Sequence, residues 1–183
     1  MERLLDIMAR LRSPEGCPWD RQQTHDSLRP YVIEEAYEVV EAIDSGPTAK
    51  IAEELGDLLL QVAFHAQIAT ELGEFTFDDV VEAICKKLVH RHPHIFGDVE
   101  ASDADQVLHN WERIKQEERQ SETGKPSSIL DAVPKYLPAL MYANKIQEKA
   151  ARVGFDWPDA DGAAAKVWEE AAEMRRTGEL LAQ

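Results

Sequence analysis

The chain has 183 residues, 44% of them hydrophobic and 30% charged, with a formal net charge of −15. This composition is typical of a folded globular protein and excludes a disordered one. So negative a charge argues against a nucleic-acid partner, because DNA and RNA are bound by basic surfaces. No apolar run approaches the roughly 20 residues that span a membrane.

Two further features predict a cytoplasmic location. The N-terminal segment MERLLDIMARLR is charged and amphipathic, unlike a secretory signal. Cys17 and Cys85 lie far apart in no metal-binding spacing, so we expect reduced thiols and neither a disulfide framework nor a zinc site.

Helical periodicity runs through the chain, and no segment has the alternating pattern of a strand. Short turn-rich loops separate the helical segments, which favours an antiparallel helical bundle like a four-helix bundle. Caps are available at Thr24, Asp26 or Ser27 for the second helix and at Thr76 for the fourth. The predicted helices cover residues 2–12, about 24–44, 50–72, 77–90 and 104–120.

The C-terminal part repeats the beginning of the chain. After a predicted linker at 121–133, a helix leads to GFDWPDADG and then to Glu-Glu-x-x-Glu, as the first helix leads to GCPWDRQQTHDS and the same acidic motif. The offset between the motifs, 34 to 169, indicates an internal duplication. We therefore predict a first domain at 1–120 and an incomplete second repeat at 134–183.

The helix at 33–43 crowds acids in VIEEAYEVVEAI. Glu34 and Glu38 are one turn apart, a like-charge pair that costs roughly 0.2–0.5 kcal/mol. On a helical wheel these acids fall opposite an apolar stripe, so this helix by itself predicts an amphipathic helix with a solvated acidic face. The stripe consists of Ile33, Ala36, Tyr37, Val40 and Ile43.

The following helix indicates that the acids of both helices belong to a binding site. IAEELGDLLLQVAFHAQIA is apolar almost all round, which predicts burial, partly against a partner. A single polar stripe nevertheless follows it at Glu54, Asp57, Gln61 and His65, and Lys50 alone lies at helical spacing to neutralise the acids. Buried carboxylates without a cation cost several kcal/mol, so these acids predict a ligand.

The two helices together predict a metal site. Glu35/Glu38 and Glu54/Asp57 each have i, i+3 spacing, which puts two carboxylates on one side of a turn. Ligation by oxygen alone suits Mg²⁺ or Mn²⁺. A di-iron site requires Glu-x-x-His and fails here, so His65 is expected to be buried and hydrogen-bonded.

A basic segment follows the acidic half. Lys87 and Arg91 are i, i+4, as are Trp111 and Lys115, so each pair can present one face to a phosphorylated ligand. Trp111 suits either stacking on a nucleoside or packing in the core. The histidines at 90, 92 and 94 are interpreted as a structural turn at a helix end rather than metal ligands.

These motifs resemble the MazG family of all-α nucleoside triphosphate pyrophosphohydrolases. The similar stretches are GCPWDRQQTHDSL, IEEAYEVVEAI, EELGDLLLQVAFHA, KLVHRHPHIFGD and WERIKQEER, which span residues 1 to about 120. The resemblance implies a helical bundle that forms a homodimer or higher homo-oligomer to complete its sites. It also implies hydrolysis of a nucleoside triphosphate to the monophosphate and pyrophosphate, with Mg²⁺ as cofactor and Mn²⁺ as a substitute.

The resemblance also implies roles for individual residues. Glu35, Glu38, Glu54 and Asp57 would be metal ligands. Glu34 would orient or deprotonate the attacking water, with Glu38 as the second catalytic carboxylate. The triphosphate and nucleoside would be held by Lys87, Arg91, Trp111 and Lys115.

The tail departs from two-domain members of this family, because it ends before a second Glu-x-x-Asp helix and the basic helix that follows it. An alternative hypothesis is therefore a nucleotide-sensing or oligomerisation module with weak or lost turnover. The resemblance implies a role in cleaning or controlling nucleotide pools, and no residue indicates a base preference.

Overall fold

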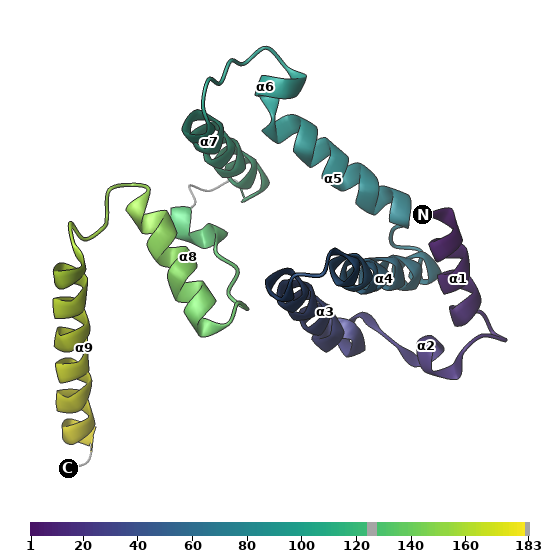
Figure 1. The fold of residues 1–183 in the computed structure, drawn as a ribbon, viewed down its shortest axis with the longest axis horizontal. Helices are drawn as coiled ribbons and strands as arrows, with labels where there is room; N and C mark the ends of the chain where they lie inside the picture. The colour runs from purple at the N-terminus through teal and green to yellow at the C-terminus, as the bar shows by residue number, and fades with distance from the viewer. Residues whose placement is uncertain (124–127, 182–183) are drawn as a thin grey trace. The chain divides into compact units, whose positions relative to one another are not determined.

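The computed structural model describes residues 1–123 and 128–181 and contains only helices, turns and loops there, with no strand. The all-α prediction is confirmed. The chain divides into two compact units, Met1–Ser102 and Asp103–Gln183, and each is described by itself. The elements, labelled in Figure 1, are α1 (Glu2–Arg12), α2 (Pro18–Gln22), α3 (His25–Ser45), α4 (Thr48–Leu72), α5 (Phe77–Arg91), α6 (Pro93–Phe96), α7 (Ala104–Thr123), the 3₁₀ helix η1 (Ile129–Ala132), α8 (Ala139–Ala151) and α9 (Ala160–Leu181).

The predicted helices are confirmed, and two of them begin at capping boxes. The Thr24 hydroxyl accepts a hydrogen bond from the Ser27 N–H at 3.2 Å, and the Thr24 N–H donates to the Ser27 hydroxyl at 2.9 Å. Thr76 and Asp79 pair in the same way at the start of α5. These bonds satisfy amide groups that have no partner within the first turn. The short helix α2 was not predicted.

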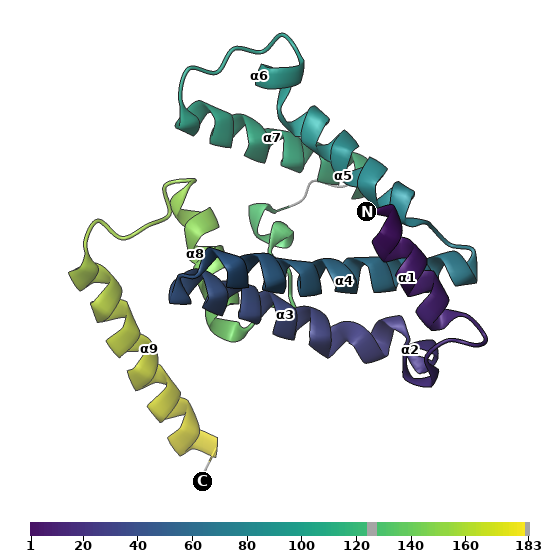
Figure 2. The same cartoon turned by 45° about the vertical axis from the view of Figure 1, so that its right-hand side comes forward.

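In the first unit α3 and α4 run side by side, as both views show (Figures 1 and 2). The core consists of Met8 from α1, Leu28 from α3, and Phe64 and Ile68 from α4, with Leu60 packed against them. This core lies toward the N-terminal end of α3 and the C-terminal end of α4. The other end of the pair is left for polar side chains.

Arg12 ties three elements of this unit together. Its guanidinium binds both carboxylate oxygens of Glu71 on α4, with Nη2 at 2.7 Å, and lies 5.5 Å from the Phe64 ring centroid. It also donates to the backbone carbonyls of Asp20 and of Gln23, the latter at 3.2 Å. The carbonyl bonds fix the loop that enters α3 and so help to set where α3 begins.

The apolar stripe of α3 stays largely exposed. Its large side chains keep 59% of their surface exposed at Ile33, 54% at Tyr37, 53% at Val40 and 57% at Ile43. α3 instead turns the face that carries Leu28 and Ala42 inward, and both residues are buried. An apolar face of this size is typical of a surface that another protein covers.

The second unit contains α7, η1, α8 and α9. Ile114 of α7 and Val133 after η1 are buried. α9 begins 135 residues after α3, which is the offset of the repeated acidic motif. The predicted domain boundary at residue 120 rests on those motifs and stays a prediction. None of the helices in the described part of the chain meets the length and hydropathy that a membrane span needs.

Candidate functional site

Three of the predicted ligands come together between α3 and α4. Glu35, Glu38 and Glu54 each place one carboxylate oxygen within 4.8 Å of the other two. Glu54 is 8% exposed, whereas Glu35 is half-buried and Glu38 exposed. Within the described ranges this is the one group of three or more His, Cys, Asp or Glu side chains that meets this criterion.

The antiparallel register of the two helices produces this meeting. His25 lies against His65 at one end of the pair, and Glu38 lies against Glu54 further along it. In both pairs the residue numbers add to nearly the same value, as two antiparallel helices in one register require. The i, i+3 spacing then brings Glu35 of α3 and Asp57 of α4 to the same level.

The carboxylates perturb one another. Partial burial raises the pKa of Glu35, and the charges of Glu38, Asp57 and Glu34 raise it further. The pKa of Glu38 is raised as well, first by the desolvation that neighbouring groups cause and then by the charge of Glu54. A cation between the two helices would relieve this repulsion.

The residues present fit a hard divalent cation. Every candidate donor is a carboxylate oxygen, the ligand type that Mg²⁺ and Mn²⁺ prefer. The Lys50 ammonium lies 3.8 Å from Glu54 and is itself half exposed, so it compensates only part of the charge. Asp57 and Glu34 lie outside the tight group of three, although the charge of each raises the pKa of Glu35.

The predicted substrate-binding residues lie on two other helices. Lys87 is exposed and Arg91 half-buried on α5, while Trp111 and Lys115 are half-buried on α7. The Lys115 ammonium lies 4.5 Å from the Trp111 ring centroid, a cation–π distance. Because α5 and α7 belong to different units, convergence of these four side chains on one ligand stays a prediction.

The second acidic motif, on α9, has cations of its own. Lys166 lies 2.9 Å from Glu169 and 3.1 Å from Glu170, and Arg176 lies 3.8 Å from Glu173. α3 has no lysine or arginine in the corresponding stretch. The glutamates of α9 are therefore paired with cations of their own helix, whereas the carboxylates on α3 have no such cation in the corresponding stretch.

The polar stripe of α4 continues beyond the carboxylates. The Nδ1 atoms of His65 and His25 lie 2.7 Å apart with parallel rings, so one imidazole donates to the other. Burial lowers the pKa of His65, and His25 lowers it further. Sequence predicted a hydrogen bond at His65; the structure confirms the bond, with the ring half-buried, and supplies a partner that sequence did not identify.

Gln61, on the same stripe, was not assigned a role from sequence. It is 7% exposed, and its buried Oε1 accepts no hydrogen bond from the protein. A buried amide oxygen of this kind needs a donor, which a water or a ligand can supply.

At the C-terminal end of α5, where the sequence predicts a structural turn, one histidine binds the helix backbone. His92 Nδ1 donates to the Leu88 carbonyl at 2.6 Å and so satisfies a group at the C-terminal end of the helix. The His92 and His94 rings are tilted relative to each other, with centroids 5.6 Å apart.

An all-helical unit with an oxygen-only carboxylate group between two antiparallel helices defines a class of candidate metal-binding helical proteins. Residues 23–96 match the MazG nucleotide pyrophosphohydrolase domain, a range that includes Glu34, Glu35, Glu38, Glu54 and Asp57. The chain belongs to the MazG family.

Similar proteins agree with this assignment. The chain is 51% identical over 174 residues to the nucleoside triphosphate pyrophosphohydrolase/pyrophosphatase MazG of Thermotoga maritima, covering 95% of this chain and 66% of the relative. It is 50% identical over 175 residues to the nucleoside triphosphate pyrophosphohydrolase of Escherichia coli K12, with the same coverage. The chain therefore spans about two thirds of the length of these relatives.

A solved structure resembles part of the fold. The crystal structure of a mazG-related protein from Thermotoga maritima has a TM-score of 0.53 and 28% sequence identity, and the match covers 63% of this chain and 98% of that one. The likeness supports the helical architecture of the MazG family.

Proposed function

We propose that this chain hydrolyses nucleoside triphosphates at the α-phosphorus, releasing the monophosphate and pyrophosphate, with Mg²⁺ or Mn²⁺ as cofactor. The observation that carries the proposal is the approach of the Glu35, Glu38 and Glu54 oxygens to within 4.8 Å of one another. The names of the similar proteins support the same reaction class.

The acidic side chains would divide the chemistry between them. Glu35, Glu38, Glu54 and Asp57 would hold the divalent metal, which neutralises phosphate charge and activates water when bound. Glu34, exposed on the same helix, would orient the attacking water and accept its proton. Attack of the water oxygen on the α-phosphorus breaks its bond to the bridging oxygen, and pyrophosphate leaves.

The basic side chains would bind the substrate. Lys87 and Arg91 would take phosphate oxygens, and Arg91 could do so through two parallel hydrogen bonds. Lys115 and Trp111 would hold the remaining phosphate and the nucleoside. We propose that the cell uses this activity in the cytoplasm to clean or control its nucleotide pools.

We also propose that the chain works as a homodimer in which a second copy covers the exposed stripe of α3. Leu55 on α4, half exposed, and the apolar side chains of α5 that remain exposed support this, because they are further exposed apolar surface in the same unit. A stable dimer needs an apolar patch of this kind at its centre.

The test is to incubate the chain with canonical and modified nucleoside triphosphates and Mg²⁺ and to separate pyrophosphate from orthophosphate. Pyrophosphate release that stops with EDTA and returns with Mg²⁺ or Mn²⁺ is expected. Orthophosphate as the sole product, or full activity in chelator, would refute the proposal. Nucleotide binding without turnover would instead support the sensing module.

Variants link the activity to the carboxylates. Glu38→Gln and Asp57→Asn should abolish pyrophosphate release while helical content is retained. Glu41→Gln is the matched control, because Glu41 is exposed on the same helix and its replacement removes the same charge. Equal loss in the control would show that charge on α3, rather than the ligand set, matters.

A further inference from the structure

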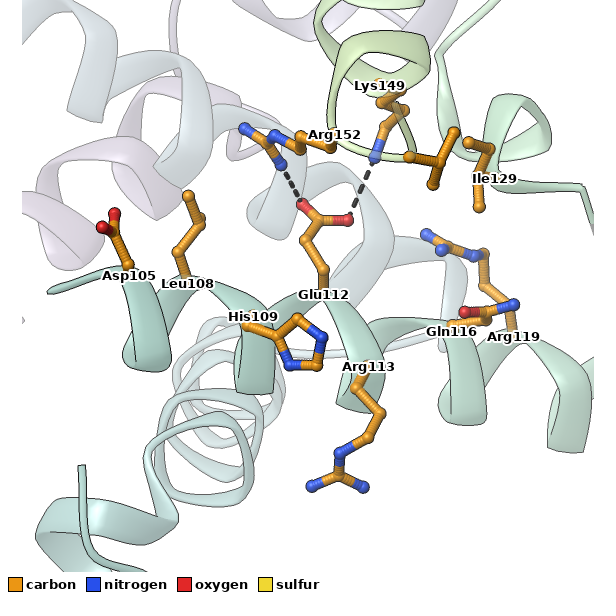
Figure 3. Close-up of a pocket in the computed structure, with 11 residues that line it drawn as sticks. Asp105, Leu108, His109, Glu112, Arg113, Gln116, Arg119, Ile129, Lys149 and Arg152 are labelled. Atoms are coloured by element: carbon orange, nitrogen blue, oxygen red, sulfur yellow. Dashed lines mark hydrogen bonds and ion pairs between the residues drawn. The ribbon is translucent and has the colours of Figure 1, made fainter. Parts of the chain in front are cut away.

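The carboxylate of Glu112 joins α7 to α8 within the second unit. Glu112 directly follows Trp111 on α7, and Lys115 comes three residues later. The carboxylate accepts from Arg152 Nη1 at 2.9 Å on Oε1 and from Lys149 Nζ at 3.1 Å on Oε2 (Figure 3). Lys149 belongs to α8, and Arg152 is the C-cap of that helix. Each oxygen of one α7 carboxylate is therefore held by a cation of the incomplete repeat.

These ion pairs are partly shielded from water. The side chain of Lys149 is 13% exposed and that of Glu112 26% exposed, so water screens the pair only in part. Desolvation by itself would raise the pKa of Glu112. Lys149, through a hydrogen bond and its charge, and then Lys115 and Arg152 outweigh this effect and hold the pKa below its usual range. Glu112 is therefore ionised at neutral pH and attracts the cations within its reach.

Lys115 is the i, i+3 neighbour of Glu112 on α7, a spacing at which a lysine and a glutamate can form an ion pair. Its ammonium nevertheless lies 4.0 Å from Glu112 Oε1, beyond hydrogen-bond distance, and 4.5 Å from the centroid of the Trp111 ring. Oε1 is the oxygen to which Arg152 Nη1 donates at 2.9 Å. Arg152 thus occupies the acceptor that Lys115 would otherwise bind.

The position of the Lys115 ammonium matters for the proposed reaction, which assigns Trp111 to the nucleoside and Lys115 to a phosphate. A carboxylate one turn away competes with phosphate for the same ammonium, because both are anionic hydrogen-bond acceptors. Cations that already bind this carboxylate weaken the competition, since they neutralise its charge and fill its oxygens. The contact between α8 and Glu112 therefore bears on how well α7 can bind a triphosphate.

We propose that Arg152 and Lys149 are positioning residues for the hydrolytic reaction: they neutralise Glu112, so that Lys115 stays beside Trp111 and binds the triphosphate. This role depends on the proposed function, which makes Lys115 a substrate ligand. Neither the sequence motifs nor the proposed reaction assigns a task to the first helix of the incomplete repeat. With this role, α8 increases the affinity for substrate without touching the substrate itself.

Steady-state kinetics of pyrophosphate release from ATP and Mg²⁺ by the whole chain test the role of Arg152. Arg152→Met keeps much of the side-chain volume and removes the cation, so Glu112 binds Lys115 in competition with the substrate. The KM for ATP should rise by about tenfold, the usual loss for a charge-assisted hydrogen bond, with kcat little changed. Arg152→Lys supplies a cation again and should keep KM near that of the wild type. Lys145→Met is the control, because Lys145 is exposed on α8 and pairs there with Glu148.

Glu112→Gln separates the positioning role from a purely structural one. When it is added to Arg152→Met, no carboxylate remains there to bind Lys115, so KM should return close to that of the wild type. Glu117→Gln in the same background is the matched control and should leave KM raised, because Glu117 is exposed on α7 and its replacement removes the same charge. If the ion pairs only hold α8 against α7, the double variant should bind ATP no better than Arg152→Met. That result, or an unchanged KM in Arg152→Met, would overturn the proposal.

Chemical acylation of Lys115 provides a measurement that needs no turnover. An ammonium bound to a carboxylate loses its proton less readily, so the amine reacts more slowly with an acylating reagent. Peptide mass spectrometry should show slower acylation of Lys115 in Arg152→Met than in the wild type, and the wild-type rate once Glu112→Gln is added. Faster acylation in Arg152→Met, as loosened packing of α8 would produce, would contradict the positioning role.

The two measurements distinguish failure of the positioning role from failure of the proposed function. If the wild type releases no pyrophosphate but Lys115 acylation follows the expected pattern, the proposed reaction is wrong and the positioning of Lys115 is supported. Normal pyrophosphate release, with KM and acylation both unaffected by Arg152→Met, would refute the positioning role alone. Circular dichroism and Tm establish that Arg152→Met is folded. If it is not, Lys149→Met gives the answer, because it frees the other oxygen of Glu112 and should raise KM to a smaller extent, again reversed by Glu112→Gln.

Discussion

Replacement of Glu54 by glutamine tests the candidate metal centre most directly. Glu54 is the most buried of the three convergent carboxylates, at 8% exposed, and its oxygen lies within 4.8 Å of oxygens of Glu35 and Glu38. Glutamine keeps the volume and one carbonyl oxygen but removes the charge. The substitution should therefore change the metal-free and metal-bound proteins in opposite directions.

The expected magnitude follows from linkage. A ligand at 100 times its Kd stabilises the folded state by about 2.7 kcal/mol. For a unit of this size 1 kcal/mol shifts Tm by about 4–8 °C, so saturating Mg²⁺ should raise the Tm of the first unit by about 10–20 °C. In Glu54→Gln that rise should shrink to a few degrees, whereas the Tm in EDTA should increase because one repelling charge is gone.

Scanning calorimetry in EDTA and in Mg²⁺ measures both effects. Glu53→Gln is the control, because the neighbouring residue is exposed on the same helix and its replacement changes the net charge equally. A Glu54→Gln variant that keeps the full Mg²⁺ shift, or that melts lower than wild type in EDTA, would show that these carboxylates do not hold the metal.

Three other predictions concern the first unit. Arg12→Met should lower the free energy of unfolding by about 2–3 kcal/mol in urea, because it leaves Glu71 without its partially buried partner, while exposed Arg10→Met should change it little. Burial, and then the charge of a neighbouring histidine, lower the pKa of His65. The unfolded chain therefore binds more protons than the folded one at about pH 6, and Tm should fall as pH drops below about 6.5. In His65→Asn the dependence of Tm on pH in this range should be weaker. Ile33→Asp should convert the proposed dimer to a monomer in sedimentation velocity, and an unchanged sedimentation coefficient would exclude that face.

The helices and the acidic pairs could be predicted from sequence because both depend on local spacing. Thr24 and Thr76 cap helices through bonds to residues three positions away, and Glu35 and Glu38 share a face by periodicity alone. The apolar stripe containing Ile33 and Tyr37 could also be predicted from sequence, but the sequence did not show that it stays exposed in the folded unit. Periodicity identifies an apolar face without indicating whether a neighbouring helix or a second chain covers it.

The sequence by itself determined an all-helical chain with two acidic motifs, an oxygen-only donor set and a basic segment after it. Only the tertiary structure decided which of the four predicted ligands come closest together, because the antiparallel register brings Glu54 to Glu35 and Glu38 and leaves Asp57 outside that group. Only it joined Glu112 to Lys149 and Arg152, 37 and 40 residues further along the chain. Such pairings depend on how helices pack, and no helical period encodes them.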